Sequence, residues 1–495
     1  MQPRHPPRAP SARLAGIPQA PAPAAEPASA QPRAPGMIEE KAKVYARAVS
    51  GVFARWRWAL VWLTQLIFYG LPWLAWNGRP AVLFDLDARR FYLFKLVLYP
   101  QDFIYLTLLL VLSALALFFV TAVAGRVWCG FACPQTVYTE IFMWIERRLE
   151  GDRGARMRLD AAPWTLPKLA RKGGKQLAWI ALALWTGFTF VGYFTPIQTL
   201  AASALALGTG PWESFWILFY GLATYGNAGY LREQVCKHMC PYARFQGAMF
   251  DRDTLIIGYD RARGETRGSR PRGADPKALG LGDCIDCTLC VQVCPTGIDI
   301  REGLQSNCIG CAACIDACDA VMDKMRAPRG LIRYSTQNGL DQGWDRAALL
   351  RRVLRPRVLV YGALLLAIAV AFVATLATRS PFRVNVLRDR AVMARQVEHG
   401  AVENVYRLQL MNAVEAPQRY RVTVSGQPGL TLMPATEVEL DAAAERSVPV
   451  AVRLAASEAQ ALAGQKLPIV FEIEQLAGGQ PDHRLTEAST FLVPR

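Results

Sequence analysis

Long apolar stretches without charged residues recur between residues 58 and 378. Most have about 20 residues, the length at which an α-helix crosses the hydrocarbon core of a bilayer. Charged residues, or Gly and Pro, close these stretches at their ends. The pattern therefore predicts a multi-domain membrane protein with an α-helical transmembrane bundle of about five spans, near residues 58–78, 103–125, 176–196, 211–231 and 357–378.

The last part of the chain follows a different period. Between residues 380 and 495, apolar and polar residues alternate in short runs such as Val405–Leu410 and Tyr420–Val424, with Pro, Gly and Asn between the runs. Alternation of this kind is typical of half-buried strands. We therefore expect an immunoglobulin-like β-sandwich over residues 380–495.

Two further segments complete the expected organisation. Residues 1–36 are rich in Pro, Ala and Arg and have almost no large apolar side chains, so we expect a disordered tail. The transmembrane region would then occupy residues 37–250. The hydrophilic stretch 251–350 would form a separate domain before the last span.

Charge distribution predicts the orientation of the spans. The formal net charge is +16, but residues 379–495 contain 13 basic and 13 acidic residues, so the excess lies earlier. Residues 126–175 contain ten Lys and Arg and residues 232–357 contain twenty, whereas residues 195–212 contain none. Because positive loops stay inside, we expect the N-terminus and the 251–350 domain on the cytoplasmic side of the membrane and the C-terminal domain on the outer side. No nucleic-acid-binding motif accompanies the charge, which argues against nucleic acid as a partner.

All twelve cysteines fall between Cys129 and Cys318, which indicates thiols used for cofactor chemistry in a reducing compartment. Eight of them form two runs with the C-x2-C-x2-C-x3-C spacing of bacterial ferredoxins. In such runs three cysteines hold one side of a 4Fe–4S cluster and the fourth cysteine of the other run closes it, whereas zinc favours two pairs on a longer loop. We expect one cluster on Cys284, Cys287, Cys290 and Cys318, and a second on Cys308, Cys311, Cys314 and Cys294.

Two further cysteine pairs stand where predicted spans reach the cytoplasmic side. Cys129 and Cys133 follow the second span, Cys236 and Cys240 follow the fourth, and a Pro follows each pair. We call these four residues the membrane-edge cysteines. On a helix, each pair would present both sulfurs on one face. Soft thiolates suit Cu(I), and a reversible dithiol/disulfide couple suits a site beside one-electron carriers, so copper handling or redox activity is the favoured interpretation.

Other interpretations of the membrane-edge cysteines are a structural zinc site, a third iron–sulfur cluster and a structural disulfide, the last disfavoured in a reducing compartment. His238 and Met239 lie inside the second pair and are additional candidates as copper ligands. A lone histidine near a membrane surface is, however, more often simply solvated.

Several motifs together resemble the cytochrome c oxidase accessory protein family (FixG, also called CcoG or RdxA). They are the segment Gly125–Thr136, the pair within Cys236–Pro241, the paired ferredoxin runs and the Cys-free outer domain. The resemblance implies an inner-membrane protein that acts in assembly of the cbb-type haem–copper oxidase and reduces Cu(II) to Cu(I) for copper chaperones. It also implies that the membrane-edge cysteines handle copper and that the eight ferredoxin cysteines carry electrons to them.

Two other functions are compatible with the sequence. One is a relay that oxidises quinol and passes electrons to a periplasmic reductase. The other is a non-catalytic scaffold that docks oxidase subunits through the outer domain. The sequence contains no dinucleotide fingerprint, flavin motif or haem-attachment motif, so in each redox case the primary electron donor is expected to be another molecule.

Overall fold

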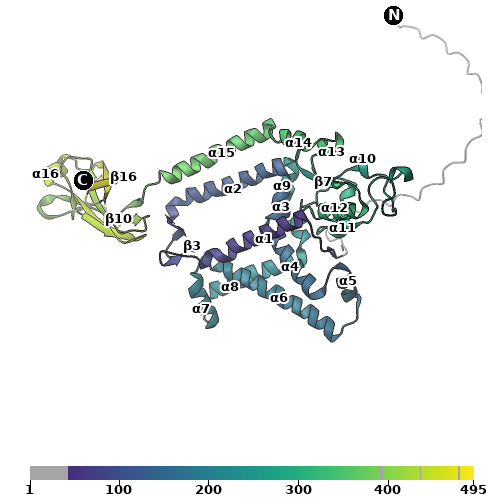
Figure 1. Cartoon of the computed structure of the whole chain (residues 1–495). Helices are drawn as coiled ribbons and strands as arrows, with labels where there is room; N and C mark the ends of the chain where they lie inside the picture. The colour runs from purple at the N-terminus through teal and green to yellow at the C-terminus, as the bar shows by residue number, and fades with distance from the viewer. Residues whose placement is uncertain (1–42, 390–393, 435, 478–479) are drawn as a thin grey trace, which may run out of the picture. The chain divides into compact units, whose positions relative to one another are not determined.

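Residues 43–389, 394–434, 436–477 and 480–495 are described by a computed structural model of the chain (Figure 1). The tail predicted at residues 1–36 lies outside the described residues. From Val44 onward the chain forms one compact unit. It contains a group of helices, a small cysteine-rich domain and a two-layered β-domain.

Five helices overlap the stretches of sequence predicted as spans. They are α1 (Val52–Gly70), α2 (Phe103–Ala124), α6 (Leu166–Val191), α8 (Pro211–Thr224) and α15 (Pro356–Ala377). Helices α2 and α15 lie side by side (Figure 1), and the hydroxyl of Tyr105 donates to the carbonyl of Thr375 at 3.1 Å. Among the described residues, two helical segments are long and apolar enough to cross a membrane, Pro100–Ala124 and Pro356–Ala377.

The other three helices differ from the predicted spans, so the five-span arrangement stays a prediction. Helix α1 starts before the predicted stretch 58–78 and includes Arg57. Helix α6 starts at Leu166, and its first turns carry Lys and Arg residues. Helix α8 ends at Thr224, where the π-helical segment η3 (Tyr225–Leu231) follows. Glycines within this last stretch lower its helix propensity.

Short elements connect these helices. Beyond the C-terminal end of α1 and that of α6 the chain forms β1 (Ala75–Trp76), β2 (Arg79–Pro80), β3 (Val82–Asp85), β4 (Arg90–Leu93), β5 (Leu96–Leu98) and α7 (Ile197–Leu205). Beyond the C-terminal ends of α2 and η3 it forms α3 (Val127–Phe131), α4 (Pro134–Glu150), α5 (Arg153–Ala161), η4 (Val235–Met239) and α9 (Pro241–Met249). The second set carries both pairs of membrane-edge cysteines.

The cysteine-rich domain is built around a two-stranded antiparallel sheet of β6 (Ile256–Tyr259) and β7 (Ile332–Ser335). Its helices are α10 (Arg261–Gly264), α11 (Leu289–Gln292), α12 (Ala313–Met325), α13 (Gln337–Asp341) and α14 (Arg346–Val353). Ile257, Ile315 and Leu331 form its core together with Phe131 of α3. The domain and the segment of the first cysteine pair therefore share one hydrophobic core.

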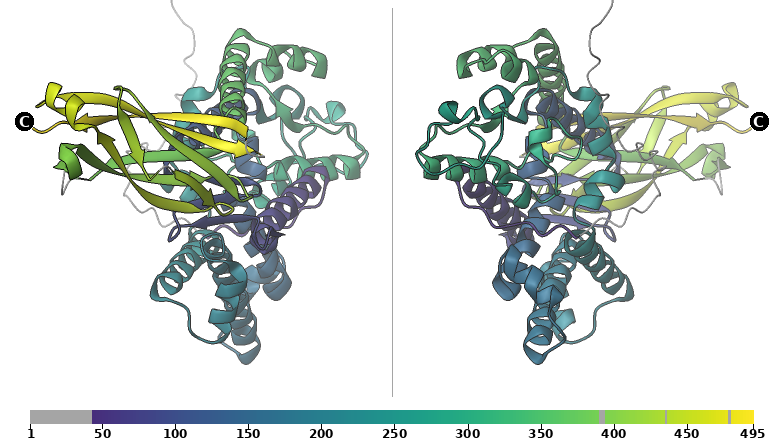
Figure 2. Two further views of the ribbon diagram at one scale, coloured as in Figure 1. Left: turned by 90° about the vertical axis from the view of Figure 1, so that its left-hand side faces the viewer. Right: turned by 90° about the vertical axis from the view of Figure 1, so that its right-hand side faces the viewer.

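The C-terminal domain is a sandwich of two antiparallel sheets (Figure 2). One sheet has the order β12-β14-β10-β8, with β9 paired to β10, and the other has the order β13-β11-β15-β16. Their strands are β8 (Phe382–Arg388), β9 (Arg395–Gln396), β10 (Val402–Asn412), β11 (Gln418–Ser425), β12 (Leu430–Met433), β13 (Thr436–Leu440), β14 (Glu445–Leu454), β15 (Lys466–Ala477) and β16 (Gln480–Leu492). Tyr406, Tyr420 and Phe471 fill the core between the sheets.

A buried carboxylate joins the start of α2 to the C-terminal domain. The side chain of Asp102 pairs with Arg379 at 2.6 Å and with Arg383 at 2.9 Å, and it accepts the backbone N–H of Tyr99 at 3.1 Å. The Tyr99 hydroxyl in turn donates to the carbonyl of Asn412 at 2.9 Å. These contacts fix the C-terminal end of α15 and strand β8 against the N-terminal end of α2.

We expect Asp102→Ala to destabilise this junction by about 3–5 kcal/mol, because it leaves two arginines near a buried site without their partner. Thermal unfolding and limited proteolysis between α15 and β8 would measure the loss. The control is Glu437→Ala, which removes the exposed pair between Glu437 and Arg421 and should cost about 0–1 kcal/mol. Equal stability of the two variants would contradict the structural role of Asp102.

Candidate iron–sulfur and cysteine sites

The two ferredoxin runs have the same backbone conformation. Thr288 and Ala312 occupy corresponding positions, and their φ values are 56° and 59°. Each residue precedes a helix, α11 with Cys290 and α12 with Cys314. The left-handed region is sparsely used by residues other than Gly, so this shared feature shows that the repeated spacing encodes a repeated loop.

Two neighbouring cavities are each lined by four cysteines. The first is lined by Cys284, Cys287, Cys290 and Cys318. The second is lined by Cys294, Cys308, Cys311 and Cys314, and Cys290 of the first set also borders it. Four thiols around one cavity form the donor set that a 4Fe–4S cluster needs, so the residues present fit one cluster in each cavity.

Burial varies among the cysteines within each set. Cys284 and Cys290 of the first set and Cys311 of the second are buried, whereas Cys287 of the first set is exposed. Burial raises the pKa of Cys290 to about 11 and that of Cys308 to about 12. Without metal, the thiols of Cys290 and Cys308 therefore hold their protons at neutral pH, and they release these protons when metal binds.

Among the described residues, no group of three or more His, Cys, Asp or Glu side chains lies close enough together to hold one metal ion. A cuboidal 4Fe–4S cluster binds one thiolate at each of its four irons, so its ligands lie further apart than those of a single ion.

The two membrane-edge pairs have matching local structure. Cys129 lies on α3 and Cys133 immediately precedes α4, while Cys236 lies on the π-helical η4 and Cys240 immediately precedes α9. In both pairs the second cysteine has an extended backbone and a Pro begins the next helix. Proline is favourable at this position, because a backbone N–H there would have no hydrogen-bond partner within the helix. π-Helical turns are rare in proteins, and those that occur often lie at functional sites.

A glutamine beside the first pair holds the segment of the second pair. The side-chain amide of Gln135 donates to the carbonyl of Asn227 at 2.9 Å and to that of Arg232 at 3.1 Å. The other three membrane-edge thiols are electrostatic neighbours of Cys236. The structure thus brings together four cysteines that come from two separate parts of the sequence.

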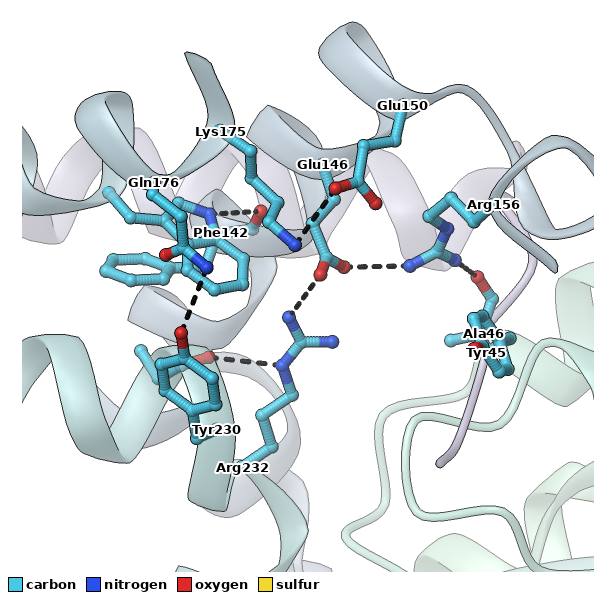
Figure 3. A network of polar contacts seen from close by, with 12 residues as sticks. Tyr45, Ala46, Phe142, Glu146, Glu150, Arg156, Lys175, Gln176, Tyr230 and Arg232 are labelled. Atoms are coloured by element: carbon cyan, nitrogen blue, oxygen red, sulfur yellow. Dashed lines mark hydrogen bonds and ion pairs between the residues drawn. The ribbon is translucent and has the colours of Figure 1, made fainter. Parts of the chain in front are cut away.

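A buried ion-pair network supports this arrangement (Figure 3). Glu146 of α4 pairs with Arg232 and with Arg156, each at 2.8 Å, and Lys175 pairs with Glu150 at 2.9 Å. Burial opposes ionisation of Glu146, but Arg232 and Arg156 outweigh burial and lower its pKa. Because Arg232 follows η3 directly, the network fixes the second pair relative to the helix that follows the first.

Gln246 of α9 contacts the first pair directly. Its side chain is fully buried, and its amide donates to Sγ of Cys129 at 3.2 Å. Burial raises the pKa of Cys129 to about 11 against the opposing effect of this hydrogen bond, and burial raises that of Cys236 to about 12. His238 and Met239 are exposed, and their role as copper ligands stays a prediction.

The first pair packs against the second ferredoxin run. A Cβ built on Gly130 would lie 2.6 Å from the carbonyl carbon and oxygen of Gly310, so the backbones of α3 and the ferredoxin loop touch. Arg126 adds a hydrogen bond from Nη1 to the carbonyl of Cys308 at 2.9 Å.

A separate cavity joins the second pair to the same ferredoxin run. Cys236 and Cys311 both line it, as do Arg57, Glu140 and Thr296. We call it the junction cavity. Each membrane-edge pair therefore meets the second four-cysteine set, the first pair through Gly130 and the second through the junction cavity.

We expect Gly130→Ala to push α3 away from the second ferredoxin run, because the added Cβ has no room beside Gly310. Such overpacking costs about 1–3 kcal/mol, so the unfolding temperature and the signal of the second cluster should both fall. The control is Gly173→Ala in α6, whose Cβ would meet nothing within 4 Å. Gly130→Ala as stable as this control would contradict the close approach.

Several residues of this region were not singled out from the sequence. Gln135, Gln246 and Arg126 position the cysteines through contacts with distant segments. Gln135 and Arg126 do lie within the Gly125–Thr136 motif that carried the family resemblance, which was the one available signal. No signal in the sequence marked Gln246, because it is an ordinary polar residue in a short helix.

Three family profiles match parts of the chain. A 4Fe-4S dicluster domain matches residues 231–337, a 4Fe-4S binding domain matches residues 106–151, and the IG-like fold at the C-terminus of FixG matches residues 372–494. These matches confirm the iron–sulfur domain and the immunoglobulin-like domain predicted from the sequence. The first two profiles also cover all four membrane-edge cysteines.

Similar proteins are found among bacterial relatives. Nitrogen fixation protein FixG of Rhizobium meliloti is 38% identical over 427 residues, which cover 80% of this chain and 82% of the relative. Protein RdxB of Cereibacter sphaeroides is 37% identical over 462 residues, which cover 91% and 96%. The crystal structure of a FixG-related protein from Vibrio parahaemolyticus aligns with 23% of this chain and 97% of its own, at 20% identity and a TM-score of 0.20.

Proposed function

The chain belongs to the FixG/RdxA family of iron–sulfur proteins, and from this we propose that it is a membrane oxidoreductase that reduces Cu(II) to Cu(I) during assembly of a cbb-type cytochrome c oxidase. Copper is the substrate, and each Cu(II) takes up one electron and leaves as Cu(I). Two 4Fe–4S clusters bound in the four-cysteine cavities would supply one-electron transfer. The electrons originate from a separate donor molecule.

The observation that carries this proposal is the meeting of all four membrane-edge cysteines beside the second four-cysteine cavity. Gly130 of the first pair's segment touches Gly310, and Cys236 of the second pair shares the junction cavity with Cys311. A thiol set next to a one-electron carrier is suited to a substrate that is reduced by one electron. A purely structural pair of cysteines would need no such neighbour.

The chain's own residues would act on copper in three ways. The thiols of the membrane-edge cysteines are soft ligands that favour Cu(I) over Cu(II). Gln246 orients Cys129 through its hydrogen bond, and Gln135 holds the segment of the second pair in reach. Because burial raises the pKa of Cys129 and Cys236, copper binding would displace protons from these thiols.

The proposed setting is the bacterial inner membrane, with five spans, the ferredoxin domain in the cytoplasm and the immunoglobulin-like domain in the periplasm. Helices α1 and α8 carry exposed large apolar side chains, including Trp62, Leu66, Phe219 and Leu222. Lipid contact would account for this exposure, because soluble proteins rarely show large contiguous apolar patches. Copper chaperones and oxidase assembly factors are the proposed partners.

Anaerobic conversion of Cu(II) to Cu(I) tests the proposal. The full chain in detergent, loaded with clusters, would be reduced, freed of reductant and mixed with Cu(II) and a chelator specific for Cu(I). We expect formation of the Cu(I)-chelate complex that depends on the clusters, measured against the cluster-free chain. No conversion above that of the cluster-free chain would contradict the proposal.

A quinol-oxidising relay is the second candidate, and the 4Fe-4S binding domain matched to residues 106–151 would give such a relay a further cluster near Cys129 and Cys133. In that case the membrane-edge cysteines would hold a third cluster. Iron content separates the two candidates when the parent is compared with a variant in which these four cysteines are serine. Equal iron content supports copper reduction, and a loss of iron together with cluster reduction by menaquinol supports the relay.

A further inference from the structure

The first helix docks onto the cysteine-rich domain through its N-terminus. The carboxylate of Asp316 in α12 accepts the backbone N–H of Phe53 at 3.1 Å and that of Ala54 at 2.7 Å. Free N–H groups at a helix start favour such a carboxylate. Arg57 lies one turn further along α1 and is thereby placed at the boundary between the helices and the domain.

Arg57 is a buried cation at the second four-cysteine set. Its side chain is 6% exposed, it lines the junction cavity with Cys311, and the Cys311 thiol is one of its electrostatic neighbours. It forms no ion pair within 4 Å with any described residue, and its Nε has no hydrogen-bond partner there. A buried charge of this kind is costly unless a nearby negative charge compensates it.

The first four-cysteine set has a different electrostatic environment. Arg301 lines that cavity, but it pairs with Asp299 at 2.6 Å and also with Asp286. Its charge is therefore largely neutralised by two carboxylates. Near the second set, the acidic neighbours of Arg57 are Glu140 and Asp316, and the oxygens of Asp316 are already occupied by the α1 backbone.

We propose that Arg57 is a positioning residue that raises the reduction potential of the cluster held by Cys294, Cys308, Cys311 and Cys314 above that of the other cluster. Reduction adds one negative charge to a cluster, and a buried cation that forms no ion pair beside the cluster stabilises that charge. Electrons then collect at the cluster that adjoins the membrane-edge cysteines. The inference rests on the proposed function for the identity of the two cofactors and deepens it by assigning their order.

Potentiometric titration followed by electron paramagnetic resonance tests this order in the full-length, cluster-loaded protein. Arg57→Met removes the charge at similar volume, a replacement that buried sites tolerate. We expect the equilibrium constant for reduction of the second cluster to fall about tenfold or more, which is 59 mV for one electron. The midpoint of the first cluster should stay unchanged, and Arg57→Lys should keep most of the parent value.

Two further variants keep the test decisive. Glu140→Gln removes a buried carboxylate that lines the same cavity, so it should shift the second midpoint in the opposite direction. Cys287→Ser, at the exposed ligand of the first set, assigns which signal belongs to which cluster. An unchanged second midpoint in both Arg57→Met and Glu140→Gln would overturn the inference. Copper reduction by the parent is measured separately, so a failure here is distinguishable from a failure of the proposed function.

Discussion

Replacing Cys129, Cys133, Cys236 and Cys240 together with serine is expected to abolish Cu(II) reduction while both iron–sulfur signals persist. Serine hydroxyls are poor ligands for Cu(I) and cannot form a dithiol/disulfide couple. None of the four lines either four-cysteine cavity, so the clusters should remain bound. We expect the rate of Cu(I) formation to fall about 100-fold or more, equivalent to about 2.7 kcal/mol.

Variants of each pair alone serve as internal controls for this result. Cys129 and Cys133 changed together, or Cys236 and Cys240 changed together, should show whether both pairs are needed. A four-serine variant that reduces copper as fast as the parent would mean that the clusters act on copper without these thiols. The quinol relay would then be the better account.

The second large effect is expected for Cys311→Ser, compared with Cys287→Ser. Cys311 is buried and lines both the second four-cysteine cavity and the junction cavity, whereas Cys287 is exposed. Cluster binding supplies folding free energy to small metal-dependent domains. Cys311→Ser should therefore remove the second cluster, weaken the contact with α3 and stop copper reduction.

Thermal unfolding, iron content and the resonance signals of both clusters would measure this difference. Cys287→Ser should change only the first cluster and leave the unfolding temperature closer to that of the parent. The opposite order, with Cys287→Ser more damaging to the second cluster than Cys311→Ser, would contradict the assignment of ligands. That result would require another pairing of the two runs.

Local patterns predicted the parts of the fold that local geometry determines. The ferredoxin spacing repeats, and the left-handed backbone conformation repeats with it at Thr288 and Ala312. In the C-terminal domain the alternation at Val405–Leu410 places Tyr406, Leu408 and Leu410 on the buried face of β10. In both cases the signal and the structure lie within a few residues of each other.

Long-range contacts were beyond prediction from one sequence. Gln246 and Cys129 are 117 positions apart, and no spacing rule links a glutamine in one helix to a cysteine in another. Arg57 illustrates the same limit, because a charge at the end of an apolar stretch is typical of a membrane boundary. Docking of α1 on the cysteine-rich domain buries it beside Cys311 instead.

The helix boundaries show a third limit. The apolar stretches of the sequence predicted the bounds of α2 and α15 closely, because charged residues and a Pro mark the ends of these helices. They did not predict that α6 extends back through basic residues to Leu166, or that α8 changes at Thr224 into a π-helical segment. Ion pairs such as that of Lys175 with Glu150 make the extended turns of α6 favourable, and these depend on tertiary structure.

A single-turnover measurement tests the central claim most directly. The cluster-loaded chain, reduced and freed of reductant, would be mixed anaerobically with equimolar Cu(II), and cluster oxidation and Cu(I) formation would be followed together. The account predicts that both proceed at one rate in the parent, and that the clusters of the four-serine variant stay reduced. Cluster oxidation by Cu(II) at the same rate in both proteins would contradict it.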